Sequence, residues 1–261
     1  MKLILMLVIA LVIHSITSAQ TPDKVLARVR YTYSNKMDTL KNQKTRVENM
    51  LLFIGKNTSL YTSYDLLNHR ISIDQKVINI AKNSVDDGKP KTISIDLSES
   101  KWMSPINHLY FFNERKHYIQ EMISDQGYII EEAAAKLNWK IAKDTLSFSG
   151  VLCQKATATH QGKNWIAWFS PRLAFQSGPW ELNGLPGLII EAHDEKNEIH
   201  FQFAGMENAR EGDFKRLRDV TKGVHAEADL INPIDIMMGF DVASAYFNIL
   251  MMRSGHRVCG S

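Results

Sequence analysis

The chain has 261 residues and a nearly balanced charge, because 31 Lys and Arg stand against 28 Asp and Glu, for a net charge of +3. The small basic excess is spread along the chain and forms no basic stripe, which argues against nucleic acid as a partner. This length is enough for one large β-rich domain or two small ones.

The N-terminus has the pattern of a secretory signal peptide. Lys2 precedes an apolar run over residues 3–13, and small residues follow up to Ala19. The run is shorter than the roughly 20 apolar residues that a membrane-spanning helix needs. Cleavage between Ala19 and Gln20 would separate a signal peptide, 1–19, from a single domain, 20–261. We therefore predict export to the periplasm or the extracellular space, with no transmembrane segment in the mature chain.

Short alternating segments follow one another along the mature chain. Residues 25–33 alternate apolar and polar side chains with a period of two, which is typical of a half-buried strand. Gln161-Gly162-Lys163 joins two further strands into a hairpin. The spacing of about ten residues favours an antiparallel sheet or barrel over βαβ units. The other predicted strands cover residues 46–54, 59–64, 108–112, 116–123, 127–130, 137–141, 151–160 and 164–169.

The clearest helical pattern lies near the C-terminus. Asn232 is a good N-cap, Pro233 suits the first helical position, and Gly255 suits the end. We predict that this helix docks on the sheet; a Met-rich surface for a partner or a membrane is the alternative. The predicted fold is mainly β with added helices (α+β): a curved antiparallel sheet or partly closed barrel with a docked C-terminal helix.

Two cysteines occur in the chain, Cys153 inside a predicted strand and Cys259 near the end. An exported chain can oxidise two such thiols to one disulfide. Sequence alone cannot bring them within bonding distance, so we favour a buried Cys153 that packs as a small hydrophobe.

The most distinctive stretch covers residues 165–191 and contains three of the five Trp and three of the seven Pro. Trp165 and Trp168 lie on opposite faces of an apolar strand, which needs cover on both sides. Pro186 and Gly187 suit a type II turn in which Gly187 has a positive φ. We predict that these aromatic residues pack in the core; the alternative is that they line a ligand groove.

The region 137–206 resembles the GLPGLI family of exported bacterial proteins. The resemblance implies an exported, β-rich protein with no established enzymatic activity, and it supplies no catalytic residues. It is carried by Trp139, by residues 150–157 and 165–169, by Gly178-Pro179-Trp180, and by Gly184-Leu185-Pro186-Gly187-Leu188-Ile189 with Glu191 close behind.

A polar face on the hairpin predicted over residues 188–203 is the best candidate site. If the apolar residues of this hairpin enter the core, then Glu191, His193, Glu198 and His200 share its outer face. Directly opposed residues have Cβ atoms about 5 Å apart, so Glu191, His193 and His200 can together bind a divalent metal. Charged and His side chains are also what any solvated strand presents.

The chain contains none of the common catalytic sequence motifs for a serine nucleophile, a zinc protease or a phosphate-binding loop. We therefore predict a non-enzymatic binding or accessory protein of the cell envelope, without a cofactor, that meets an apolar ligand, a peptide or an envelope protein. The alternative is a metal-binding protein or metal-dependent hydrolase that uses the His/Glu cluster of the 188–203 hairpin.

Overall fold

The computed structural model describes residues 24–36, 45–83, 103–123, 126–210 and 213. The predicted signal peptide, the predicted C-terminal helix and Cys259 lie outside the described residues. In the described part, no helix combines the length and the apolar character that crossing a membrane requires.

Eleven antiparallel strands form a single sheet, and one helix, α2 (Tyr64–Asn83), is described beside it. The order across the sheet is β6-β5-β4-β3-β2-β1-β11-β10-β9-β8-β7. This result confirms the predicted mainly antiparallel β class, and the sheet is open, with β6 and β7 at its edges. The strands are β1 (Ala27–Asn35), β2 (Arg46–Ile54), β3 (Thr58–Ser63), β4 (Asn107–Phe111), β5 (Lys116–Ile123), β6 (Gln126–Ala133), β7 (Lys140–Phe148), β8 (Val151–His160), β9 (Lys163–Ser170), β10 (Leu188–Asp194) and β11 (Ile199–Asn208).

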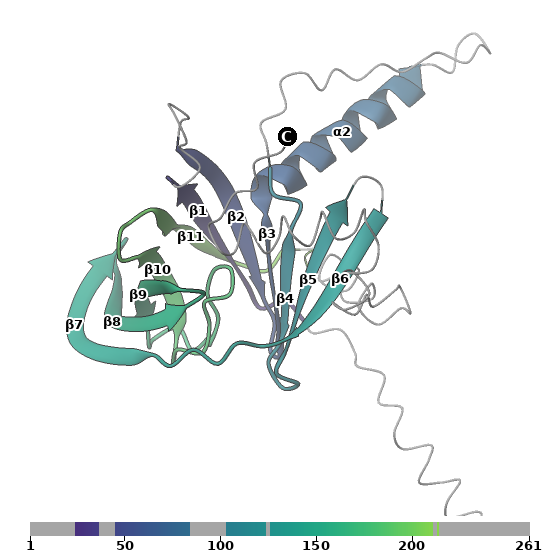
Figure 1. Ribbon diagram of the computed structural model, residues 1–261. Helices are drawn as coiled ribbons and strands as arrows, with labels where there is room; N and C mark the ends of the chain where they lie inside the picture. Colours follow the sequence, from purple (N-terminus) through teal and green to yellow (C-terminus); the bar gives the residue numbers. More distant parts are fainter. Residues whose placement is uncertain (1–23, 37–44, 84–102, 124–125, 211–212, 214–261) are drawn as a thin grey trace, which may run out of the picture.

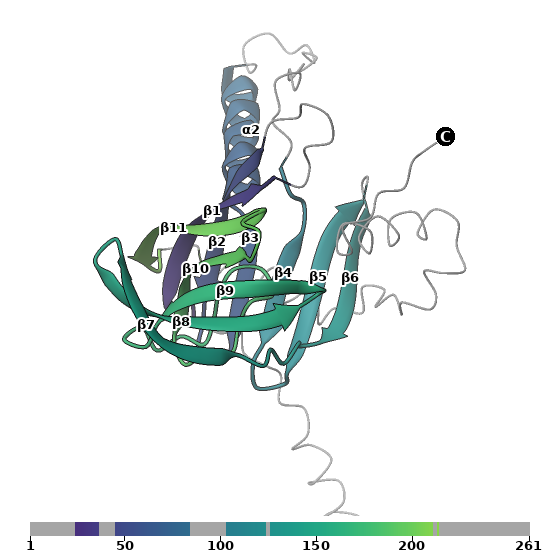
Figure 2. The same ribbon diagram turned by 60° about the vertical axis from the view of Figure 1, so that its left-hand side comes forward.

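The two ends of the sheet run in different directions. Figures 1 and 2 show β8 and β9 crossing the direction of β4, β5 and β6 rather than continuing it. The connection between β9 and β10, residues 171–187, lies between these two parts of the sheet, because its Glu181 is close to β4 and β5 and its Trp180 contacts β9 and β11.

Both faces of the central strands are covered, which explains why residues 50–54 are all buried. One face carries Tyr31, Leu52 and Tyr61, which pack in the same buried cluster as Trp165; we call it the Trp165 face. The opposite face carries alternate residues of the same strands, including Leu51 and Phe53, and packs against Leu67 of α2.

Helix α2 projects away from the sheet (Figures 1 and 2). Its first turn is capped by Ser63, whose Oγ accepts a hydrogen bond from the Leu66 N–H at 3.0 Å. Asp65 ties the same turn to β2 by accepting the Asn49 N–H at 3.0 Å. Farther along, Ile71 and Ile78 are 43% and 51% exposed. The residue pattern of this segment does not predict a helix, because it has no continuous apolar stripe.

Candidate functional site

The connection 171–187 packs against the Trp165 face through apolar side chains. The ring of Trp180 lies 5.5 Å from that of Trp165 and 6.5 Å from that of Phe201. Leu182 and Leu185 of the connection are fully buried in the same cluster as Trp165. Trp165 is itself fully buried, whereas Trp168 is half-buried on the other face, with its ring 5.8 Å from that of Phe148.

Two glycines let the connection approach other main-chain atoms closely. A Cβ on Gly187 would lie 2.2 Å from the carbonyl oxygen of Ser170, and one on Gly178 would lie 2.3 Å from that of Leu182. The positive φ of the motif belongs instead to Gly184, at +84°. The predicted type II turn with a positive φ at Gly187 is therefore wrong.

The turn at Pro186 is a tighter one than predicted. The Gly187 N–H donates to the carbonyl oxygen of Leu185 at 2.8 Å, which makes a three-residue turn centred on Pro186. Leu188 then donates to the carbonyl oxygen of Leu173 at 2.9 Å, so the connection also bonds to the start of β10.

Two histidines lie side by side on the Trp165 face. Tyr61 pairs with His108, and Tyr110 pairs with His117, so both imidazoles emerge on this face from neighbouring strands β4 and β5. Their rings stack at 5.4 Å, with His108 Nδ1 3.2 Å from His117 Nε2. The Tyr110 ring stacks on His117 at 4.2 Å and 4° between planes, which fixes the orientation of that imidazole.

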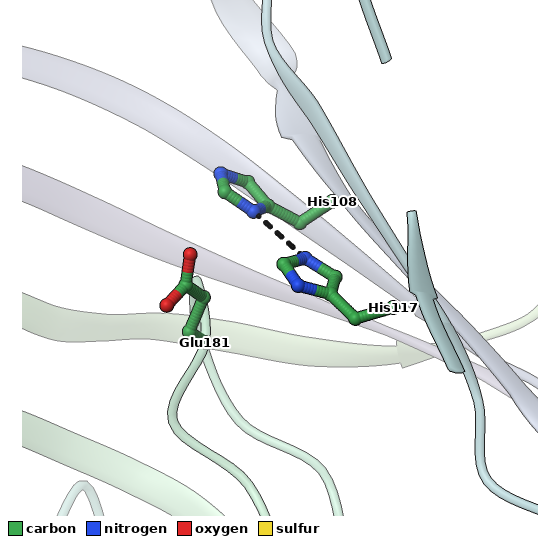
Figure 3. Close-up of side chains that lie close together, drawn as sticks. All are labelled: His108, His117 and Glu181. Carbon is green, nitrogen blue, oxygen red and sulfur yellow. Dashed lines mark hydrogen bonds between the residues drawn. The ribbon is translucent and has the colours of Figure 1, made fainter. Parts of the chain in front are cut away.

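A carboxylate from the connection completes the cluster (Figure 3). Glu181 directs its side chain at the two rings, and one ligand atom from each of His108, His117 and Glu181 lies within 4.8 Å of the others. All three residues are buried, with exposed fractions of 8%, 2% and 3%. We call these three residues the His-His-Glu cluster.

The cluster has polar neighbours on two sides. His160 Nε2 lies 2.8 Å from Glu181 Oε2, and Gln161 Nε2 donates to the same oxygen at 2.7 Å. His117 Nδ1 lies 3.6 Å from Glu132 Oε2, within ion-pair distance. Glu181 and His117 are therefore each close to a further ionisable or amide group, and a buried carboxylate requires such partners.

Imidazole nitrogens and carboxylate oxygens are atoms that divalent metals bind in proteins. Imidazole nitrogens bind zinc at about 2.0–2.1 Å and carboxylate oxygens at about 2.0–2.2 Å, so tetrahedral ligand atoms lie roughly 3.3 Å from one another. The two ring nitrogens are already 3.2 Å apart. Without a metal, His108 and His117 lie within hydrogen-bond distance of each other, and Glu181 is hydrogen-bonded to the turn between β8 and β9.

The sequence-predicted metal residues come together only in part. His193 and His200 oppose each other across β10 and β11, with rings 5.7 Å apart, and Glu191 Oε1 lies 2.7 Å from His200 Nε2. His193 Nδ1 is instead 2.8 Å from the carbonyl oxygen of Asp194. Among the described residues, the three-atom convergence within 4.8 Å occurs at the His-His-Glu cluster and not at Glu191, His193 and His200.

A register shift between Ile189 and Glu191 changes which side chains of β10 point to each face of the sheet. Strict alternation would place Ile189 on the same face as Glu191, but Ile189 is fully buried. The extra residue of the bulge turns Ile189 to the core and Glu191 away from it.

Comparisons with known proteins bear on the fold only. No family model and no curated protein matches the chain. Among solved structures, PNGF-II in the P21 space group superposes with a TM-score of 0.50 at 12% identity, over 74% of this chain and 30% of that chain. PNGF-II in the C2 space group gives a TM-score of 0.49 at 12% identity, over 73% and 29%. The chain thus spans less than a third of PNGF-II, and the likeness is one of fold.

Proposed function

We propose that this protein is a non-enzymatic metal-binding protein that holds a divalent transition metal between His108, His117 and Glu181. The observation that carries the proposal is the convergence of three metal-binding atoms within 4.8 Å in the protein interior. This is the ligand chemistry of the alternative raised from the sequence, at a different set of residues.

The donor set favours zinc and its neighbours in the first transition row. Imidazole suits zinc, copper and nickel, whereas calcium and magnesium prefer sites built from oxygen alone. Metal-bound histidines usually interact with a carboxylate through their second nitrogen, and Glu132 stands 3.6 Å from Nδ1 of His117 in that role.

The burial of the His-His-Glu cluster favours a structural metal over a catalytic, hydrolytic one. A catalytic zinc keeps an open position for water and substrate, whereas a structural metal is enclosed by the chain. His117 and Glu181 are 2% and 3% exposed, and Tyr110 covers one face of His117. A metal here would join the connection to β4 and β5 and so stabilise the fold.

Export, envelope location and the GLPGLI resemblance belong to the same proposal and rest on sequence patterns. The signal-like residues 1–19 support action outside the cytoplasm. The contacts of Glu181 with both β4–β5 and the β8–β9 turn support the description of the sheet as curved. A docked C-terminal helix would complete this architecture.

Metal analysis of protein purified without chelator tests the proposal. The test variant is the double substitution His108→Gln with His117→Gln, and the matched control is His193→Gln with His200→Gln. We expect the wild type and the control to bind about one zinc ion per chain and the test variant to bind none. No zinc on the wild type, or equal zinc on both double variants, contradicts the proposal.

A further inference from the structure

A third histidine, outside the His-His-Glu cluster, is bonded to the carboxylate of the cluster. His160 ends β8, and its Nε2 lies 2.8 Å from Glu181 Oε2. Gln161, the next residue, donates to the same oxygen at 2.7 Å. Both bonds therefore come from the turn between β8 and β9, a part of the sheet distant from β4 and β5 in strand order.

Contacts with two tryptophans fix the position of His160. Its carbonyl oxygen accepts the indole N–H of the buried Trp165 at 3.3 Å. Its ring lies 5.4 Å from that of Trp180, the residue next to Glu181. The turn that follows has positive φ at Gln161 and Gly162, at 47° and 72°, as in tight two-residue hairpins.

A carboxylate has two oxygens, and the two bonds from this turn end on one of them. A metal bound through Oε1 of Glu181 would leave the bonds from His160 and Gln161 to Oε2 in place. A ligand held in this way loses less rotational freedom when the metal binds, because its orientation is already set.

We infer that His160 is a positioning residue of the metal site: its bond to Oε2 holds the Glu181 side chain in the orientation that brings the carboxylate close to His108 and His117. The inference rests on the proposed function. Partners of this kind change metal affinity by about 10–100-fold without being ligands themselves. Removal of the His160 bond should therefore weaken metal binding and leave its stoichiometry unchanged.

Zinc titration by competition with a chromogenic chelator tests the inference on the full mature chain. His160→Phe keeps an aromatic ring beside Trp180 but removes the bond to Glu181, and we expect zinc affinity about 10–100-fold below wild type. His160→Gln restores an N–H donor of similar reach and should recover most of that affinity. His193→Phe, a histidine outside these contacts, should leave the affinity unchanged.

Recovery of zinc affinity by His160→Gln separates a positioning role from a packing role. If His160 acted only by packing, zinc affinity would depend on the volume of the side chain and not on its N–H donor. Equal zinc affinity in the wild type and His160→Phe overturns this inference alone, and so does a failure of His160→Gln to recover affinity. Absence of zinc from the wild type overturns the proposed function itself. If His160→Phe does not fold, His160→Met removes the same bond with a flexible side chain that has no N–H donor, and unchanged zinc affinity there also overturns the inference.

Discussion

The hydroxyl of Tyr31 in β1 donates a 2.6 Å hydrogen bond to the main-chain carbonyl oxygen of Ile189 in β10, 158 residues along the chain. Strand β11 lies between these two strands in the sheet. The Ile189 N–H donates to Ser177 of the connection at 3.0 Å. At the bulge after Ile189, β10 is thus bonded to the connection and to Tyr31.

Loss of this hydroxyl should destabilise the protein. Tyr31→Phe leaves the carbonyl of the fully buried Ile189 without its side-chain donor, at about 1–3 kcal/mol of the free energy of unfolding. Tyr33→Phe is the matched control, because the Tyr33 hydroxyl accepts a part-buried bond from Asn35. The midpoint of urea denaturation should be clearly lower for Tyr31→Phe than for Tyr33→Phe. Equal midpoints would show that the buried hydrogen bond does not stabilise the protein more than the part-buried one. Burial also raises the pKa of Tyr31, so the bond should persist in alkaline solution.

The close approach of Gly187 to Ser170 predicts that position 187 does not tolerate a side chain. In Gly187→Ala the new Cβ would lie 2.2 Å from a carbonyl oxygen, and main-chain atoms cannot move aside as a flexible side chain does. We expect a loss of about 3 kcal/mol or more in unfolding free energy. Gly162→Ala meets no atom within 4 Å but adopts a φ of +72°, so only about 1–2 kcal/mol should be lost there. A milder effect at Gly187 than at Gly162 would refute this interpretation.

Cys153 should be an unreactive thiol at neutral pH. Burial, with a contribution from the charge of Glu191, raises the pKa of Cys153 to about 11. In a Cys259→Ser background, iodoacetamide should label the native protein far more slowly than the unfolded one, and faster as the pH approaches 11. Rapid native labelling at pH 7 would contradict this expectation.

The raised pKa of Cys153 also makes the free energy of unfolding depend on pH. The folded-state pKa lies above the value of about 8.5 for an unfolded thiol, so the folded protein holds its proton longer. The contribution to stability is fully present below the unfolded value and is lost as the pH rises from there through about 11. In Cys153→Ala, the free energy of unfolding should fall less steeply with pH over this range. An unchanged slope would show that other groups cause the pH dependence.

Much of the sheet could be predicted because alternation and turn residues are local signals. Residues 46–54, 116–123 and 151–160 were predicted with the bounds of β2, β5 and β8. Helix α2 was missed because its contact with the sheet rests largely on Leu67 near one end, so burial left little periodic pattern along it. Similarly, a one-residue bulge at Ile190 is invisible to strict alternation.

The candidate site was missed for a different physical reason. His108 and His117 sit on neighbouring strands of a hairpin, so their proximity could have been read from its register. Glu181 comes from a connection without regular structure, and no local pattern indicates that it crosses to β4 and β5. The predicted residues Glu191 and His200 do meet, at 2.7 Å, because they share one hairpin.

Anomalous diffraction from zinc-soaked crystals, recorded on both sides of the zinc absorption edge, tests the metal-binding claim most directly. We expect one strong difference peak bonded to His108, His117 and Glu181. A peak at Glu191 and His200 instead, or none at the His-His-Glu cluster at saturating zinc, would contradict it.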